Sequence, residues 1–259
     1  MRLVDSHCHL NYKGLVEDQT GVLTRARDAG VSGFLNISTK QAEWPQIVAA
    51  AEREPDVWAS IGVHPHEADK HLDVTSDTLI KAAGHLKVIG LGETGLDYFY
   101  EHSDRTAQQM LFRRHIAAAR ELDLPVIIHT RDAEEDTFAV LQEELRKGAF
   151  PALIHCFTGS EAFARAVLEL GLSVSISGIV TFKNAKTLQT VAATVPDDRL
   201  LVETDSPFLA PVPHRGKVCE PAYVRDTAGF IAGLRGISSD RLAEQTTANF
   251  FGLFGKAAA

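Results

Sequence analysis

The sequence predicts a single (β/α)8 barrel of the TIM type, an α/β fold in which eight parallel strands alternate with helices. Short runs rich in Val, Ile and Leu are each followed by a longer amphipathic segment, and this alternation occurs eight times in 259 residues. Polar side chains suited to metal binding or proton transfer follow the same end of six of these runs. Because active sites of such barrels lie at that end, we interpret residues 1–259 as one domain with a site at the carboxyl-terminal mouth of the strands.

The expected strands lack strict alternation of apolar and polar residues, as is usual for parallel strands buried on both faces. They lie at residues 3–6, 31–38, 57–63, 87–93, 125–129, 152–156, 172–177 and 200–204. Helices are expected at 15–29, 41–53, 106–122, 133–146, 161–170, 185–193, 221–233 and 239–250. An open, doubly wound sheet is the alternative, because the number of strands does not show that a sheet closes.

Composition and charge exclude several classes of protein. Hydrophobic residues make up 45% and charged residues 23% of the chain, which is typical of a globular protein. The net charge of −8 argues against a protein that coats nucleic acid, although it allows a local basic patch around a site that cuts phosphodiester bonds. Three widely spaced cysteines fit a reducing compartment, and no apolar run reaches the roughly 18 residues of a membrane span. We expect a cytoplasmic protein that does not enter a membrane.

His7 and His9, at the end of the first expected strand, are the first candidate metal ligands. Alternate side chains of an extended strand point the same way, so two imidazoles at this spacing can converge on one divalent ion. The pattern is weak alone, because the chain contains eleven histidines. Asp5 lies two residues earlier on the same face, where a carboxylate can support a ligand.

Glu93 ends the fourth expected strand, in a glycine-rich segment that continues to Asp97 and Tyr98. The glycines allow a tight turn and a close approach of backbone. The neighbours of Glu93 are apolar, so a carboxylate buried there needs a cation or a hydrogen-bond donor as partner; a solvent-facing side chain is the alternative. Asp97, in the following loop, could orient a ligand or simply cap the loop, and we expect it to contact the substrate.

His129 and His155 each close an apolar run, and His64 follows the third run. A single histidine in such a place is more often a hydrogen-bonded core residue than a ligand. Because His129 and His155 end consecutive strands at matching depth, that account is less convincing for the pair. We therefore interpret both as candidate ligands.

Glu203 and Asp205 follow the same alternation at the end of the eighth expected strand. Asp205 is nearer the mouth, where it can act as a ligand and as a proton acceptor. Glu203 is one layer deeper, where a carboxylate can fix the tautomer of a histidine. A buried ion pair inside the barrel is the alternative for Glu203.

Several cations follow the strands on the same side. Arg131 comes directly after His129, and the loop after the eighth strand carries Arg215 between Pro213 and Gly216. The guanidinium group matches the geometry of phosphate oxygens, so we expect Arg131 and Arg215 to contact an anionic substrate. Solvated loop charge is the alternative for any one of them.

This ordered set of residues resembles the TatD-type metal-dependent deoxyribonucleases, within the amidohydrolase-like TIM-barrel superfamily. The resemblance extends over nearly the whole chain, from the segment Asp-Ser-His-Cys-His-Leu at 5–10 to Asn-Phe at 249–250. The landmarks between them are Gly-Val-His-Pro-His at 62–66, Gly-Glu-Thr-Gly-Leu-Asp-Tyr at 92–98, His-Thr-Arg at 129–131, His-Cys-Phe-Thr-Gly at 155–159 and Glu-Thr-Asp-Ser-Pro at 203–207. One departure is Cys219, which stands before Glu220-Pro221 where the family usually has Asn.

The resemblance implies two divalent metal ions at the mouth of the barrel. By matching motifs, the first ion is expected to be held by His7, His9, Glu93 and Asp205. The second is expected to be held by Glu93, His129 and His155, so that Glu93 bridges the pair. His64 is expected to contact the substrate or its phosphate. Zinc, magnesium and manganese all remain open, because imidazole ligands favour zinc or manganese and phosphate substrates accept magnesium.

Two adjacent ions suit hydrolysis at phosphorus. Asp205 would accept the proton of the attacking water, while His64 and Arg215 hold the phosphate. The resemblance implies DNA as the substrate, with single strands or ends favoured, and no stable protein partner is expected. A small-molecule amidohydrolase and a D-aminoacyl-tRNA deacylase remain alternatives that could use the same metal centre. A non-enzymatic metal-binding protein is a third, and its ligands would leave no open position.

Overall fold

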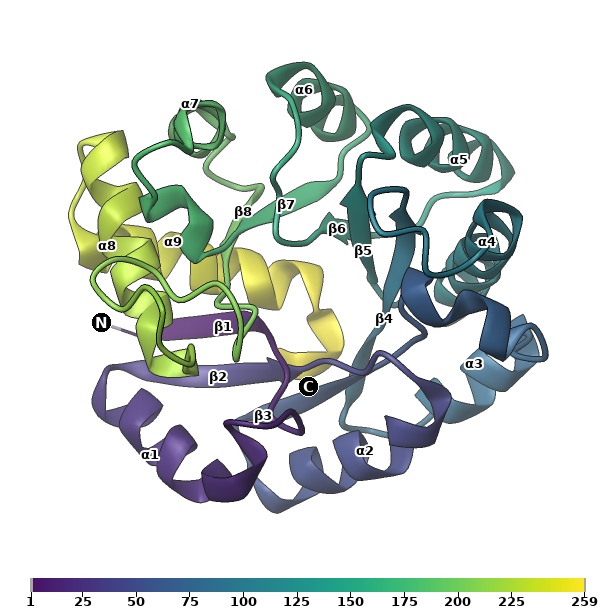
Figure 1. Cartoon of the computed structure of the whole chain (residues 1–259), viewed down its shortest axis with the longest axis horizontal. Helices are drawn as coiled ribbons and strands as arrows, with labels where there is room; N and C mark the ends of the chain where they lie inside the picture. Colours follow the sequence, from purple (N-terminus) through teal and green to yellow (C-terminus); the bar gives the residue numbers. More distant parts are fainter. Residues whose placement is uncertain (1, 259) are drawn as a thin grey trace.

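The structure, a computed structural model that describes residues 2–258, is a barrel of eight parallel strands with helices around it (Figure 1). The strands follow one another around the barrel in sequence order. They are β1 (Leu3–Cys8), β2 (Val31–Asn36), β3 (Val57–Ile61), β4 (Val88–Asp97), β5 (Val126–Arg131), β6 (Ala152–Ile154), β7 (Ser173–Ile176) and β8 (Leu200–Val202). The predicted (β/α)8 barrel is confirmed.

The first and last strands meet and close the sheet. The hydroxyl of Ser6 donates a hydrogen bond to the carbonyl of Val202 (3.0 Å). The carboxylate of Asp5 accepts from the backbone N–H (2.9 Å) and from the hydroxyl (2.6 Å) of Thr204. Cys8 and Ser206 form a parallel bridge just beyond. The alternative of an open, doubly wound sheet is therefore excluded.

Helices surround the barrel wall, and all eight expected helices are present within a few residues of their predicted bounds. The α-helices in residues 2–258 are α1 (Gln19–Asp28), α2 (Trp44–Arg53), α3 (Ser76–Ala83), α4 (Arg105–Leu122), α5 (Glu134–Lys147), α6 (Glu161–Glu169), α7 (Lys186–Thr194), α8 (Val224–Arg235) and α9 (Ser239–Leu253). Helix α3 was not predicted. It is short, and the side chain of Thr75 caps it by accepting the N–H of Thr78 (3.2 Å). None of the helices described is long and apolar enough to cross a membrane.

The barrel has two apolar cores, one between strands and helices and one inside the barrel. The inner core includes Val4, Leu35, Ile89, Ile127, Leu153 and Leu201. Phe250 and Phe254, at the end of α9, pack against these residues. Figure 1 shows α9 passing behind the ring of strands. The barrel is thus filled at one end, and the polar site described below lies at the other.

Several strands end at different residues from those predicted. Strand β4 continues to Asp97, so the expectation that it ends at Glu93 was wrong. Its pairing with β5 shifts register between Leu91 and Thr94, and Gly92 and Gly95 have φ of +147° and +136°. Glycine tolerates these angles, so the strand can bend around Glu93 and resume pairing. Strand β8, in contrast, ends at Val202 and leaves residues 203–205 in the following loop.

Candidate metal centre

Four donor side chains meet at the mouth of the barrel. His7 is in β1 and His9 directly follows that strand. Glu93 is in β4, and Asp205 is in the loop after β8. Nε2 of His7 lies 3.3 Å from Nε2 of His9, 3.3 Å from Oε2 of Glu93 and 3.6 Å from Oδ1 of Asp205. Nε2 of His9 lies 3.3 Å from the same Asp205 oxygen. Tetrahedral zinc with bonds of about 2.0–2.1 Å holds its ligand atoms roughly 3.3–3.4 Å apart, so this spacing fits one ion.

The second oxygen of Glu93 faces a different set of histidines. Oε1 lies 2.8 Å from Nε2 of His155, 3.0 Å from Nδ1 of His129 and 3.3 Å from Nε2 of His64. Glu93 is only 3% exposed, so both of its oxygens depend on these neighbours. The carboxylate therefore joins two groups of nitrogen donors, one on each side.

Within residues 2–258, three groups of His, Glu or Asp are close enough together to hold a metal ion. They are His7 with His9 and Asp205, His7 with Glu93 and His155, and His64 with Glu93 and His129. The structure thus brings together all six ligands predicted from the sequence. It also places His64 among them, although the sequence suggested a contact with substrate.

The outer edges of three imidazole rings indicate which nitrogen can face a metal. Nδ1 of His9 lies 3.3 Å from the carbonyl of Ile37, and Nε2 of His129 lies 3.0 Å from Oδ2 of Asp97. Nδ1 of His155 lies 3.4 Å from Oε1 of Glu203, an ion-pair distance. Each of these oxygens favours a proton on the nitrogen that it faces. The lone pair is then on the inward nitrogen, as a metal ligand requires.

The imidazole of His64 has its proton on the nitrogen that faces the site, unlike the three rings above. Its Nδ1 accepts the backbone N–H of His66 (3.1 Å), and burial lowers its pKa to about 4. A neutral ring whose Nδ1 is an acceptor carries its proton on Nε2, the nitrogen that faces Glu93. His64 therefore presents an N–H donor to the site, and this suits contact with an anion better than contact with a metal.

Opposite charges are concentrated in the cluster. Burial alone would raise the pKa of Glu93, but the nearby His155 and His64 hold that pKa well below its usual range. Burial opposes the charged form of His155 too, yet Glu93 and Glu203 raise its pKa well above the usual value. Burial, and then the proximity of His155, lower the pKa of His7. The cluster thus pairs an ionised Glu93 with a protonated His155, and a divalent cation, which binds the neutral ring, would have to displace that proton.

Asp5 and Glu203, the two carboxylates expected to support the ligands, are both fully buried beside the donors. Asp5 accepts the backbone N–H of His7 (3.3 Å) in addition to its two bonds from Thr204, and burial raises its pKa to about 8. Glu203 is fully buried and accepts a hydrogen bond from the hydroxyl of Ser175 through its other oxygen. Asp5 fixes the backbone on both sides of the closure between β1 and β8, and Oε1 of Glu203 lies at ion-pair distance (3.4 Å) from Nδ1 of His155.

Asp97 was grouped with the substrate contacts on sequence grounds, but the structure gives it protein partners. It is 1% exposed. Its Oδ2 faces His129 (3.0 Å) and Nε2 of His66 (2.9 Å), and its Oδ1 accepts the N–H groups of Phe99 and Tyr100 (3.1 Å each). His66 was not among the expected site residues. The His-x-His spacing of residues 64–66, which repeats that of residues 7–9, was the signal for it.

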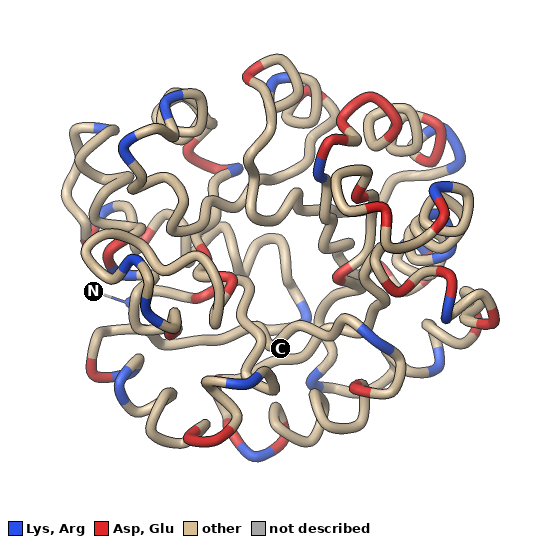
Figure 2. The backbone as a smooth tube through the Cα atoms, viewed as in Figure 1, with Lys and Arg blue, Asp and Glu red and all other residues tan. Residues whose placement is uncertain are grey.

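The two predicted arginines are exposed and lie over aromatic rings. The guanidinium carbon of Arg131 is 4.1 Å from the ring centre of Phe99 and 4.8 Å from that of Tyr100. The corresponding carbon of Arg215 is 4.1 Å from the ring centre of Phe182. Figure 2 shows that Lys and Arg are spread around the periphery rather than gathered on one broad face.

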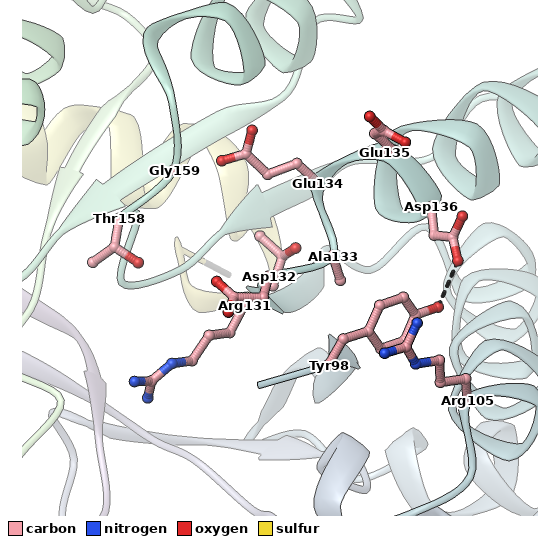
Figure 3. Close-up of a pocket in the computed structure, with 11 residues that line it drawn as sticks. Tyr98, Arg105, Arg131, Asp132, Ala133, Glu134, Glu135, Asp136, Thr158 and Gly159 are labelled. Carbon is pink, nitrogen blue, oxygen red and sulfur yellow. Dashed lines mark hydrogen bonds between the residues drawn. The ribbon is translucent and has the colours of Figure 1, made fainter. Parts of the chain in front are cut away.

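A pocket of about 600 Å³ lies beside the centre, between the start of α5 and the loops after β4 and β6. Figure 3 shows Glu134, Glu135 and Asp136 on one side of it, and Arg131 extending away from them. Tyr98 donates a hydrogen bond to Asp136 (2.7 Å) across the pocket. None of the candidate metal ligands lines this space, so we treat it as separate from the metal centre.

Cys219, the departure from the family pattern, is a buried structural residue. Its backbone N–H donates to the carbonyl of Pro207 (2.9 Å), and burial raises the pKa of its thiol. This backbone hydrogen bond connects the far end of the long loop after β8 to its beginning, close to Asp205.

A TIM barrel with a buried carboxylate shared between two sets of histidines belongs to the class of metal-dependent hydrolases. The family model described as TatD related DNase matches residues 4–255, and the chain belongs to this family. It is 46% identical over 257 residues to the uncharacterized metal-dependent hydrolase YcfH of Escherichia coli K12, covering 98% of this chain and 96% of that protein. It is 35% identical to a protein of Erwinia tasmaniensis named 3'-5' ssDNA/RNA exonuclease TatD, covering 97% and 99%. The crystal structure of YJJV, a TatD homologue from Escherichia coli K12, covers 98% of both chains with a TM-score of 0.90 at 29% identity.

Proposed function

We propose that this protein hydrolyses phosphodiester bonds of single-stranded DNA with two divalent metal ions. The observation that carries the proposal is the position of Glu93: one oxygen faces His7 and the other faces His129 and His155. A single metal ion needs only one of these groups of donors. A carboxylate between two groups is the arrangement of a two-metal hydrolase.

The proposed ligands rest on the distances between the donor atoms and, for His9, His129 and His155, also on the ring orientations. His7, His9, Asp205 and one oxygen of Glu93 would hold the first ion, and His129, His155 and the other oxygen of Glu93 the second. Histidine-rich donors favour zinc or manganese, whereas a phosphate substrate allows magnesium as well. When bound, such a pair of ions lowers the pKa of a water and draws charge from the phosphate oxygens.

The remaining steps belong to side chains of the chain itself. Asp205 is 16% exposed at its side chain, so it can reach a water at the mouth and accept its proton. The Nε2–H of His64 would donate to a phosphate oxygen. Arg131 and Arg215 would hold flanking phosphates on the loops. Glu203 and Asp97 would keep His155 and His129 in the tautomers that bind metal, and Asp5 would hold the loop of Asp205 against β1.

Single-stranded nucleic acid as the substrate is supported by the likeness to relatives named as ssDNA/RNA exonucleases. The charge pattern agrees with it, since a broad basic face for coating a duplex is missing from the part of the chain described, and cations lie on mouth loops. The centre is also buried among histidines, so a substrate must enter the mouth rather than lie across it.

The test is metal analysis followed by a panel of substrates. Purified protein is assayed for zinc, manganese and magnesium, and then for hydrolysis of end-labelled single-stranded DNA, duplex DNA, RNA, D-aminoacyl-tRNA and an uncharged ester. We expect two ions per chain and the highest kcat/KM on single strands. Turnover of D-aminoacyl-tRNA or of the ester, without cleavage of any oligonucleotide, would overturn the proposal.

A further inference from the structure

Exposed aromatic side chains are confined to the mouth of the barrel. In residues 2–258, the Phe, Tyr and Trp side chains that are largely exposed are Phe99 (53%), Tyr100 (47%) and Phe208 (50%). Phe99 and Tyr100 follow β4, and Phe208 follows β8, directly after the strands and loops that supply metal-site residues. Leaving three large rings in water is unfavourable, and exposed apolar surface gathered beside a site commonly marks a place where a ligand binds.

Phe208 lies on one side of the candidate metal centre. Its backbone N–H donates to the carbonyl of Asp205 (3.0 Å), which fixes the residue relative to that candidate ligand. Its ring stands edge-on to His9 and Tyr12, with centre-to-centre distances of 6.3 and 6.0 Å. Tyr12 in turn stacks on His9 at 4.6 Å. The neighbouring rings thus hold Phe208 in place while half of its surface stays open.

Phe99 and Tyr100 lie on another side, beside His129. Oδ1 of Asp97 accepts hydrogen bonds from both of their backbone N–H groups, while its Oδ2 faces His129. The guanidinium of Arg131 lies over both rings. Tyr100 is also stacked parallel to His102 at 5.5 Å, so Phe99 is the more open of the two rings. This side therefore combines an exposed flat ring with a cation that can also reach a phosphate.

We infer that these two groups of rings are base-stacking positions, which receive unpaired bases of a single strand whose phosphate lies on the metal centre. The inference rests on the proposed function and adds the residues that select the substrate. Aromatic side chains stack on any base because every base has a flat π face, and in a duplex those faces are already covered. Continuity of both groups with the donor cluster, and the cation over one of them, indicate a polyanion that carries flat rings.

The experiment compares a short oligothymidylate with a strand of the same length made of abasic residues. The variants are Phe208→Ala, Phe208→Tyr and Phe99→Ala. Leu86→Ala is the matched control, because Leu86 is 84% exposed in the connection between α3 and β4, at the opposite end of the barrel. Stacking on an aromatic side chain is commonly worth a factor of roughly 5 to 100 in affinity.

We expect each Ala variant at a ring position to lower kcat/KM on oligothymidylate by about that factor and to leave the abasic strand nearly unchanged. Phe208→Tyr should behave like the wild type, and so should Leu86→Ala. Equal losses on both strands would assign the rings a structural role. A wild-type enzyme that cuts both strands equally well would overturn the inference and leave the proposed function standing.

A binding experiment tests the stacking positions independently of the nuclease proposal. A strand containing 2-aminopurine is titrated with metal-free protein, because stacking quenches the emission of this base. Quenching that disappears in Phe208→Ala or Phe99→Ala would support the stacking positions, and if the same wild-type protein cuts no oligonucleotide after zinc, manganese or magnesium is returned, the nuclease proposal is overturned. Unquenched emission at saturating protein would overturn the stacking positions.

Discussion

Oδ2 of Asp97 lies 3.0 Å from Nε2 of His129, on the edge of the ring opposite Glu93. Burial alone would raise the pKa of Asp97, but the hydrogen bonds from His129 and His66 and from the following backbone hold that pKa below its usual range. The carboxylate is thus ionised, and it keeps the proton of His129 on Nε2. The lone pair of Nδ1 is left facing the centre.

Replacing Asp97 by Asn should weaken metal binding without removing a ligand. An amide can donate to Nε2 of His129 and so favour the wrong tautomer. Loss of such a supporting carboxylate commonly lowers metal affinity by about 10- to 100-fold. Metal titration of the chelated protein measures the effect. Asp136→Asn is the control, because Asp136 accepts from Tyr98 in the neighbouring pocket. Equal affinities in wild type and Asp97→Asn would contradict the positioning role.

Glu93→Gln should be more damaging than His7→Ala. The carboxylate serves both groups of donors and supplies negative charge, whereas His7 serves one group. We expect Glu93→Gln to lose both ions and nearly all turnover, and His7→Ala to retain the ion on the side of His129. Metal content and kcat, measured on the same preparations, compare the two. Two ions and near wild-type turnover in Glu93→Gln would show that the bridging role is wrong.

Arg215→Ala should weaken cleavage of nucleic acid and leave the metal content unchanged. A charge-assisted hydrogen bond to phosphate is worth roughly 1.5–3 kcal/mol, so kcat/KM should fall by about 10- to 100-fold at low salt and less at high salt. Arg215→Lys should recover only part of the loss, because a point charge does not reproduce a two-pronged contact. An uncharged ester, if it is turned over, serves as the comparison. The same loss on ester and oligonucleotide would indicate a structural role for Arg215.

Removing the metal should abolish hydrolysis without unfolding the barrel. The predicted ligands are at the mouth, and the two apolar cores consist of other residues. Activity and far-UV circular dichroism are measured after treatment with EDTA and dialysis, and again after zinc or manganese is returned. Full activity in demonstrably metal-free protein would rule out the two-metal mechanism.

His115 should make stability depend on pH in a defined direction. It is fully buried on α4, its Nδ1–H donates to Leu111 (2.8 Å) and its Nε2 accepts the N–H of Val63 (3.2 Å). Burial lowers its pKa to about 4. The unfolded chain binds this proton near pH 6.5, so the contribution of neutral His115 is complete above pH 6.5 and is lost as the pH falls toward 4.

The measurement is urea unfolding of wild type and His115→Gln between pH 7.5 and 4, with chelator present throughout. The difference in free energy of unfolding between the two should decrease by up to about 1.4 kcal/mol per pH unit, and by roughly 3 kcal/mol in all. Other titrating groups are common to both proteins and cancel. A difference that stays constant with pH would contradict the assignment.

The strands and the ligand positions were predictable because both signals are local. Buried parallel strands require apolar runs, and histidines that directly follow several such runs, as His129 and His155 do, rarely gather at one end of a sheet by chance. Helix α3 was missed because eight residues carry too little periodicity. Its clearest mark is the single cap at Thr75.

What the sequence could not supply depends on contacts between distant residues. The continuation of β4 beyond Glu93 is set by renewed pairing with β5, not by the residues of β4 alone. The proton positions of His64 and His129 depend on the backbone of His66 and on the carboxylate of Asp97. The exposure of Phe99 and Phe208 could not be predicted from the sequence, because phenylalanine side chains are usually buried.

The closure between β1 and β8 joins residues that are 196 and 199 positions apart in the chain. Bringing such distant segments together costs loop-closure entropy and follows the local pairing of consecutive strands. His7 and His9 lie on one side of this seam, and Asp205 lies on the other. An ion bound by all three residues would cross-link the first strand to the loop that follows the last strand. Such an ion could be captured only once the ring has closed, and it would slow the reopening of the barrel at its longest-range join.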